Sequence, residues 1–120
     1  MTRILVVDDE PQILRALRIN LRARHYDVDT ASDGAAALRA AANHHPDLVV
    51  LDLGLPDMEG TDVIHGLRGW TTIPIIVLSG RSGSRDKVDA LRNLQDLPGR
   101  NCYLLRVTAP GQQRYHLVPQ

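Results

Sequence analysis

Four polar residues of this 120-residue chain stand directly after short apolar runs, and together they suit the transfer of a phosphoryl group. Asp8 and Asp9 follow the first run, Asp52 the second and Ser79 the third. Mg²⁺ in proteins is bound by one or two carboxylates that leave open positions for a phosphate. Asp52 is the predicted nucleophile, which would form an acyl phosphate. The Ser79 hydroxyl could then donate a hydrogen bond to a phosphoryl oxygen.

Three carboxylates brought close together repel one another and favour the binding of a cation. Two unit charges about 4 Å apart cost about 4 kcal/mol at an effective dielectric near 20. A magnesium ion would relieve this repulsion and neutralise charge on the transferring group. Such a site normally also needs a fixed cation, but the only lysine of the chain, Lys87, falls within a predicted helix.

The apolar runs predict the strands of a sheet. Residues 4–7, 48–51 and 73–78 are short and continuously apolar, as in strands that are covered on both faces. Residues 26–31 alternate in polarity, which predicts a strand nearer the edge of the sheet. Residues 103–107 and 115–118 read as two further short strands, separated by a Pro-Gly turn.

Helical patterns separate the first four strands. Pro11 opens the first predicted helix, Ser32 or Asp33 caps the second, and shorter helices are expected near residues 63–67 and 86–94. Regular alternation of strands and helices predicts an α/β fold with a doubly wound, flavodoxin-like parallel sheet. Ligands of such sheets lie beyond the carboxyl ends of the strands, where all four polar residues fall.

Composition excludes several classes of protein. The length fits one domain, and 43% hydrophobic with 23% charged residues is typical of a globular protein. A net charge of zero argues against nucleic-acid binding by bulk charge. The single cysteine, Cys102, excludes an internal disulfide and suits a reducing compartment. Because no apolar run is long enough for a signal peptide or a membrane span, we expect a cytoplasmic protein.

Three segments closely resemble the receiver domain of two-component response regulators, in order, in spacing and in their placement at strand ends. They are residues 4–10, 51–60 and 74–80. Residues 9–17 and 67–70 resemble more narrowly the KdpE type, the regulators of potassium-transport operons. The resemblance extends to about Leu91.

The resemblance implies a role for each matching position. Asp52 matches the phosphoacceptor, and Ser79 matches the switch hydroxyl that turns toward the phosphate. Asp9 matches the direct Mg²⁺ ligand, Asp8 its largely water-mediated helper, and the backbone carbonyl of Gly54 a third protein ligand. The implied partner is a sensor histidine kinase. The implied chemistry is self-catalysed phosphorylation of an aspartate, so the chain is not expected to be an enzyme.

The chain departs from the family pattern after Leu91. The family continues toward a strand with a lysine near position 101, where this chain has Asn101. Residues 103–106 restore a Tyr-x-x-cation pattern five residues late, which makes Arg106 a candidate substitute cation. A guanidinium binds phosphate well but does not place a compact point charge as lysine does. We therefore expect an incomplete fifth strand–helix unit.

The tail suggests a second region. Residues 1–94 form the predicted receiver-like domain, and residues 95–120 resemble the last hairpin of the winged-helix DNA-binding domain found in the same regulators. A hairpin without its recognition helix would not read the major groove, so no direct DNA binding is expected. The sequence thus predicts a truncated and impaired receiver.

Two alternatives to a phosphorylated receiver remain. The first is a pseudo-receiver that is not phosphorylated and acts as a decoy, either by occupying the kinase or by forming homodimers or heterodimers with full-length regulators. The second is a small phosphohydrolase with an aspartyl nucleophile. Such enzymes usually carry a second acid two residues after the nucleophile, and this chain has Gly54 there.

Overall fold

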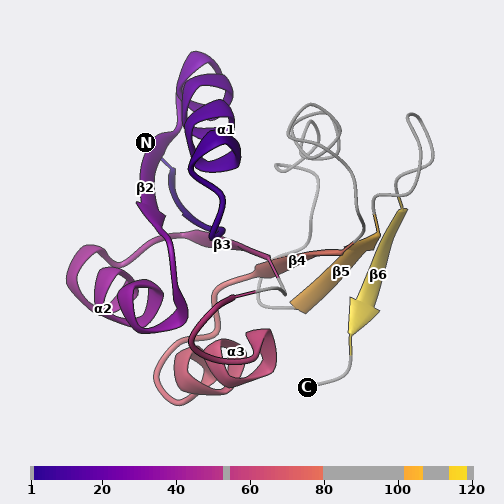
Figure 1. Cartoon of the computed structure of the whole chain (residues 1–120). Coiled ribbons are helices and arrows are strands. Elements are labelled where there is room, and N and C mark those ends of the chain that lie inside the picture. The colour runs from indigo at the N-terminus through magenta and orange to yellow at the C-terminus, as the bar shows by residue number, and fades with distance from the viewer. Residues whose placement is uncertain (1, 53–54, 80–101, 107–113, 119–120) are drawn as a thin grey trace.

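A six-stranded sheet forms the centre of the structure, a computed structural model that describes residues 2–52, 55–79, 102–106 and 114–118 (Figure 1). The strands are β1 (Arg3–Val7), β2 (Asp27–Ala31), β3 (Leu48–Asp52), β4 (Ile75–Ser79), β5 (Cys102–Arg106) and β6 (Arg114–Val118). Their order across the sheet is β2-β1-β3-β4-β5-β6. The first five strands pair in parallel, and β6 pairs antiparallel with β5. The predicted flavodoxin-like sheet is confirmed, with one antiparallel strand added at its edge.

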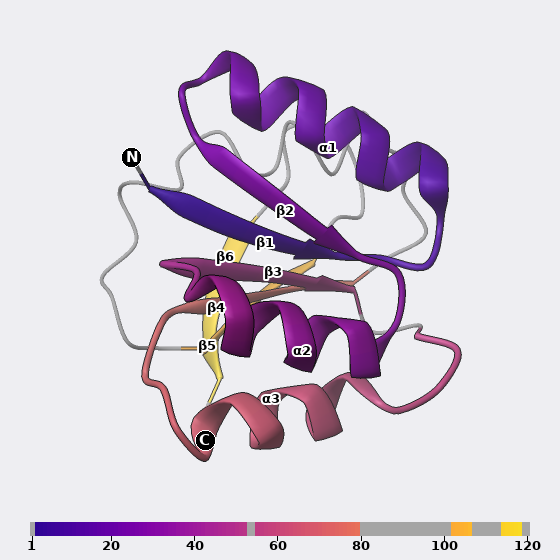
Figure 2. The same ribbon diagram turned by 90° about the vertical axis from the view of Figure 1, so that its left-hand side faces the viewer.

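Helices cover both faces of this sheet. They are α1 (Pro11–Ala23), α2 (Gly34–His44) and α3 (Gly60–Arg68). Figure 2 shows α1 on one face, with α2 and α3 together on the other. Successive residues of a strand point to opposite faces, so Ile4 and Val6 join the apolar cluster under α1 while Leu5 and Val7 join the cluster under α2 and α3. This double burial explains why β1 is continuously apolar.

The helices follow their sequence patterns closely. Pro11 lies at the start of α1, and Ile13, Leu17 and Leu21 form its buried stripe. The arginines of α1 are exposed, as a solvated face requires. Asp33, one of the two predicted caps, is the N-cap residue of α2 and accepts a hydrogen bond from the N–H of Ala36 at 2.7 Å.

Strand β4 begins two residues later than predicted, at Ile75. Pro74 has no N–H to donate to a neighbouring strand, which delays the regular ladder. Its carbonyl still accepts a hydrogen bond from the N–H of Val49 at 3.1 Å, so the chain is already beside β3 at this point.

The tail contributes strands to the same sheet. β5 pairs with β4 over five residues, so the fifth parallel strand is present, and the next element that the structure describes is the strand β6. The predicted helix over residues 86–94, with Lys87, lies outside the described residues. The division at residue 94 stays a prediction.

None of the helices among the described residues has the length and the apolar character of a membrane span.

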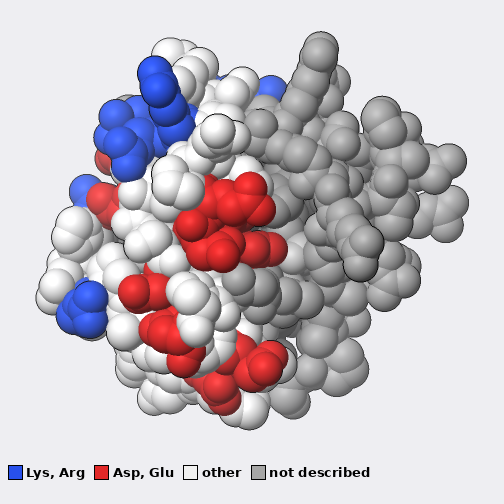
Figure 3. All heavy atoms as spheres, in the orientation of Figure 1, with Lys and Arg blue, Asp and Glu red and all other residues white. Residues whose placement is uncertain are grey.

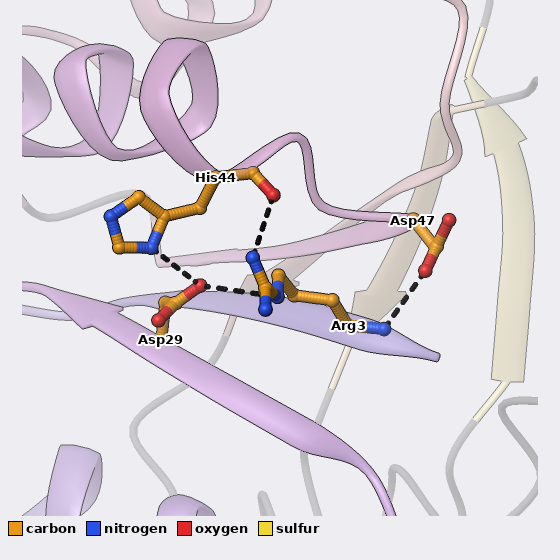
Figure 4. A network of polar contacts seen from close by, with 4 residues as sticks. All are labelled: Arg3, Asp29, His44 and Asp47. Atoms are coloured by element: carbon orange, nitrogen blue, oxygen red, sulfur yellow. Dashed lines mark hydrogen bonds and ion pairs between the residues drawn. The ribbon is translucent and has the colours of Figure 1, made fainter. Parts of the chain in front are cut away.

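A polar network closes the amino-terminal edge of the sheet (Figure 4). The Arg3 N–H donates to the Asp47 carboxylate at 2.9 Å, and Arg3 Nη1 donates to the His44 carbonyl at 3.0 Å. The Asp29 Oδ2 atom lies 3.8 Å from Arg3 Nε and 3.1 Å from His44 Nδ1. Exposed ion pairs contribute little free energy, so this network mainly orients the start of β1 relative to β2, α2 and β3. It lies at the edge opposite the predicted phosphoryl site.

Candidate functional site

The predicted site residues meet at the carboxyl edge of the sheet. Asp8 directly follows β1, Asp52 ends β3, Ser79 ends β4 and Arg106 ends β5. Val7 of β1 is the register partner of Leu51 in β3, so Asp8 and Asp52 each come one position later on neighbouring strands. Parallel strands therefore bring together positions that are far apart in the sequence, as predicted.

An acidic cluster lies at this edge. One carboxylate oxygen from each of Asp8, Asp9 and Glu10 lies within 4.8 Å of the other two. Asp8 is only 1% exposed, whereas Asp9 and Glu10 are exposed. Figure 3 shows acidic side chains gathered in the middle of one face, with basic side chains toward the end where α1 lies.

The turn between β1 and α1 orients these acids. The Asp8 N–H donates to the carbonyl of Ala31 at 3.1 Å, which extends the pairing with β2 by one residue. The Asp8 Oδ1 atom accepts a hydrogen bond from the Glu10 N–H at 2.9 Å. Glu10 is the N-cap residue of α1, but its side chain makes no capping hydrogen bond, and its carboxylate joins the cluster instead.

Sequence reasoning did not assign Glu10 to the site. The available signal was its place directly after Asp8 and Asp9. The three-carboxylate cluster does not include Asp52, which is half-buried and is placed by the register of β3 beside β1. The structure thus groups Asp8 and Asp9 with Glu10, and the expected ligand role of Asp52 stays a prediction.

The acidic cluster fits a magnesium ion. Carboxylate oxygens are hard ligands, and a buried carboxylate beside two others is costly unless hydrogen bonds or a cation compensate it. Asp8 has such a hydrogen bond from Glu10, and Asp9 and Glu10 remain open to solvent. Open positions of this kind are what a partly hydrated Mg²⁺ requires.

For two other predicted site residues, Ser79 and Arg106, the structure gives the strand register. Ser79 of β4 and Arg106 of β5 are register partners, so the candidate substitute cation lies on the strand next to the candidate switch residue. Arg114, the first residue of β6, is in turn the register partner of Arg106. Gly54 lies outside the described residues. The roles of these residues stay predictions.

The segment 55–59, which leads into α3, is joined to α2 by Asp57, a residue that sequence reasoning missed. The Asp57 carboxylate accepts hydrogen bonds from the N–H groups of Gly34 and Ala35, at 2.7 and 2.9 Å. The hydrogen bond from Gly34, followed by that from Ala35, holds the pKa of the Asp57 carboxyl below its ordinary value. The only sequence signal was a Pro-Asp pair in a loop, which is typical of turns.

The lowered pKa of Asp57 predicts a pH-dependent contribution to stability. A carboxyl whose pKa is depressed on folding stabilises the fold above its unfolded pKa, near 4, and loses this contribution as the pH falls through the folded value. We therefore expect Asp57→Asn to be less stable than wild type at pH 7, with the difference shrinking below about pH 4. Urea unfolding across this range measures it.

Asp27→Asn, at the exposed start of β2, is the control for removing one negative charge. A difference between wild type and Asp57→Asn that stays constant down to pH 2 would contradict the assignment of the two hydrogen bonds to an ionised Asp57.

Comparisons with known proteins agree with this geometry. The family model described as the response regulator receiver domain matches residues 4–95. The transcriptional regulatory protein KdpE of Mycobacterium tuberculosis (strain H37Rv) is 71% identical over 91 residues, which cover 76% of this chain and 40% of the relative. KdpE of Escherichia coli (strain K12) is 46% identical over 91 residues, with the same coverage of both chains. The chain thus spans about 40% of the length of these relatives.

Solved structures share the fold. The response regulator TrrA from Thermotoga maritima, in complex with Mg²⁺-BeF, is 32% identical with a TM-score of 0.66, over 93% of this chain and 90% of that one. A receiver domain protein from Clostridium thermocellum is 25% identical with a TM-score of 0.66, over 92% of this chain and 83% of that one. With a family model matching most of its length, and with the strand order and strand-end acids of that fold, the chain belongs to the receiver domain family of two-component response regulators and is similar to the receiver region of KdpE.

Proposed function

We propose that this chain accepts a phosphoryl group on Asp52, with Mg²⁺, from a sensor histidine kinase in a two-component phosphorelay. The observation that carries the proposal is the placement of Asp52 at the carboxyl edge of the sheet, on the strand next to the one that leads into the acidic cluster of Asp8, Asp9 and Glu10. The similarity to TrrA, solved with Mg²⁺-BeF, supports the choice of metal.

The proposed step is a displacement at phosphorus. An Asp52 carboxylate oxygen forms a bond to the phosphorus of a phosphohistidine, the P–N bond breaks, and the imidazole nitrogen keeps the electron pair and takes up a proton. Asp9, Asp8 through water, Asp52 and the Gly54 carbonyl would hold Mg²⁺, which when bound neutralises charge on the phosphoryl oxygens. The Ser79 hydroxyl would donate a hydrogen bond to one of these oxygens. The chain modifies itself, so it does not act as an enzyme on a separate substrate.

The test is phosphorylation by a small phosphodonor such as phosphoramidate, followed by intact mass spectrometry. We expect one phosphoryl group per chain in excess Mg²⁺, removable by hydroxylamine as an acyl phosphate should be. Chelation with EDTA should prevent incorporation, and added Mg²⁺ should restore it. Incorporation that EDTA leaves unchanged would count against a metal-assisted site.

Arg106 is proposed as the cation that replaces the missing lysine. Its placement beside Ser79 supports this role, because a cation there would lie at the same edge of the sheet as Asp52. We expect Arg106→Ala to slow phosphorylation about threefold, since a single ion pair at a protein surface typically contributes no more than about 1 kcal/mol. Arg106→Lys should restore the rate or exceed it.

Arg24→Ala, an exposed change at the far end of α1, is the matched control for Arg106. Equal rates in Arg106→Ala and wild type would show that the cation is not needed. In that event Arg114→Ala and the double variant should be measured, because Arg114 is the register partner of Arg106.

The alternative is a pseudo-receiver that binds partners without being phosphorylated. It is favoured by one observation, that the only lysine of the chain is Lys87 while Asn101 stands where the family has its lysine. Such a chain would occupy the kinase, or pair with itself or with full-length regulators. It should inhibit phosphotransfer from the kinase to a full-length regulator while taking up no phosphate itself.

Partners and location follow from the same proposal. The exposed arginines of α1 are a candidate docking face for the kinase. The relatives are named as transcriptional regulators, so we expect this chain in the cytoplasm, with the DNA that such regulators control.

We expect these 120 residues alone not to bind DNA, because a net charge of zero supplies little counterion release. A mobility-shift assay at low salt tests this.

A further inference from the structure

We propose that Asp57 is a positioning residue of the phosphoryl site, which holds the loop after Asp52 in place by tying it to the amino end of α2. The inference rests on the proposed function, because it names a residue that acts on phosphorylation through Asp52. Asp57 touches neither the acidic cluster nor the phosphoryl group in this proposal. Its contacts are with the backbone of α2.

Asp57 completes the capping of α2 from outside the helix. The first N–H groups of any helix lack partners within it. In α2 the Ala36 N–H donates to the Asp33 side chain and the Ala37 N–H donates to the Asp33 carbonyl, as at an ordinary N-cap. The first two, of Gly34 and Ala35, go instead to the two carboxylate oxygens of Asp57, which lies 23 and 22 residues further along the chain.

Side-chain packing also brings this loop close to the start of α2. Gly34 is buried, and a Cβ atom placed there would collide with the side chain of Met58, the residue after Asp57. Met58 and Leu55 also pack against the apolar cluster under α2 and α3. The Met58 side chain therefore lies directly against the backbone of α2 at Gly34, and it would have to shift to make room for a larger residue there.

The loop lies between two described elements, β3 and α3. Asp52 ends β3, and Glu59 forms a reciprocal capping box with Asp62 that opens α3. Between these ends the Asp57 carboxylate is the polar contact that joins the loop to another element among the described residues. A negative charge at a helix N-terminus is favourable, so this tie persists even though Asp57 is exposed.

Asp57 therefore links the loop to α2 in addition to capping the helix. Asp33 stabilises α2 without contact to the loop, whereas Asp57 stabilises α2 only when the loop is in place. Loss of Asp57 removes the polar contact between this segment and α2, whereas loss of Asp33 leaves that contact in place. The two residues thus form a matched pair that separates helix stability from loop position.

The experiment compares Asp57→Ala with Asp33→Ala in the full chain. Mg²⁺ affinity is measured by calorimetry, phosphorylation rate by mass spectrometry with phosphoramidate, and stability by urea unfolding. We expect Asp57→Ala to weaken Mg²⁺ binding and slow phosphorylation about fivefold, less than is typical when a residue that contacts a metal ligand is lost. Asp33→Ala should lower stability comparably and leave both other quantities unchanged. Asp57→Asn, which keeps one acceptor oxygen, should fall between wild type and Asp57→Ala.

Backbone hydrogen exchange shows whether the tie has been broken. The Gly34 and Ala35 amides should exchange faster in Asp57→Ala than in wild type. If they do while Mg²⁺ affinity and rate stay at wild-type values, the positioning role is wrong and the proposed function stands. Equal losses in Asp33→Ala and Asp57→Ala would likewise reduce Asp57 to a cap. If wild type itself binds no Mg²⁺ and takes no phosphate, the proposed function fails and the positioning role fails with it.

Discussion

Asp52→Asn is expected to abolish phosphate incorporation, a fall on the order of 100-fold or more. The amide has the size of the carboxylate, so β3 and its neighbours should keep their register. An amide oxygen is a far weaker nucleophile than a carboxylate and cannot form the acyl phosphate of the proposed step. The measurement is intact mass spectrometry after reaction with phosphoramidate and Mg²⁺, with unfolding curves to show that the fold is kept.

Asp27→Asn is the matched control for this prediction. It makes the same chemical change at the exposed start of β2, at the edge opposite the site. We expect it to take up phosphate like wild type. Hydroxylamine-labile phosphate on Asp52→Asn would mean that another carboxylate is the acceptor, and the central assignment would be lost.

Asp8→Asn is expected to change metal affinity and stability in opposite directions. Asp8 is 1% exposed and lies in the acidic cluster with Asp9 and Glu10. Replacing a residue that orients a metal site commonly lowers affinity about 10- to 100-fold, and we expect a loss of Mg²⁺ affinity in this range. Titration calorimetry with MgCl₂ measures it.

The same substitution should stabilise the metal-free protein. Carboxylates within 4.8 Å repel by about 1 kcal/mol in water and by more in a less polar setting. Asn keeps an oxygen that can accept the hydrogen bond from the Glu10 N–H, so this contact is retained. We expect Asp8→Asn to be about 1 kcal/mol more stable than wild type in EDTA by urea unfolding.

Added Mg²⁺ should reverse this order of stability. A ligand that binds only the folded protein stabilises it in proportion to ln(1 + [L]/Kd), and we expect wild type to bind the ion more tightly than Asp8→Asn. The two unfolding midpoints should therefore cross as Mg²⁺ is raised into the millimolar range. Parallel curves with no crossing would show that the cluster does not hold the metal.

Much of the fold could be predicted from local patterns. The runs that became β1 and β3 are apolar at every position because helices cover both faces of the sheet. The apolar stripe of Ile13, Leu14, Leu17 and Leu21 predicted the inner side of α1, and all but the partly buried Leu14 are buried. Because parallel strands align their carboxyl ends, these patterns also predicted that the acids at the strand ends would meet.

The tail shows that local patterns do not predict which strands pair or in which register. Residues 103–107 were predicted as a strand, but their composition does not specify a neighbour. The structure pairs β5 with β4 so that Arg106 lies opposite Ser79, and it adds β6 beyond β5. Strand register is set by pairing between distant segments, so no local pattern could have placed Arg106 in this way.

By itself, then, the sequence determined the strand-end placement of Asp8, Asp9, Asp52 and Ser79 and, through its resemblance, the family. These properties depend on burial and periodicity, which the pattern of apolar residues within each segment predicts. Only the tertiary structure decided that the Glu10 carboxylate joins the cluster and that Asp57 caps α2. The Glu10 carboxylate is placed by the local turn between β1 and α1, whose geometry the residue types alone do not specify. The Asp57 contact depends on how a loop and a helix that are distant in sequence come to lie together, and the sequence near Asp57 does not identify its partner.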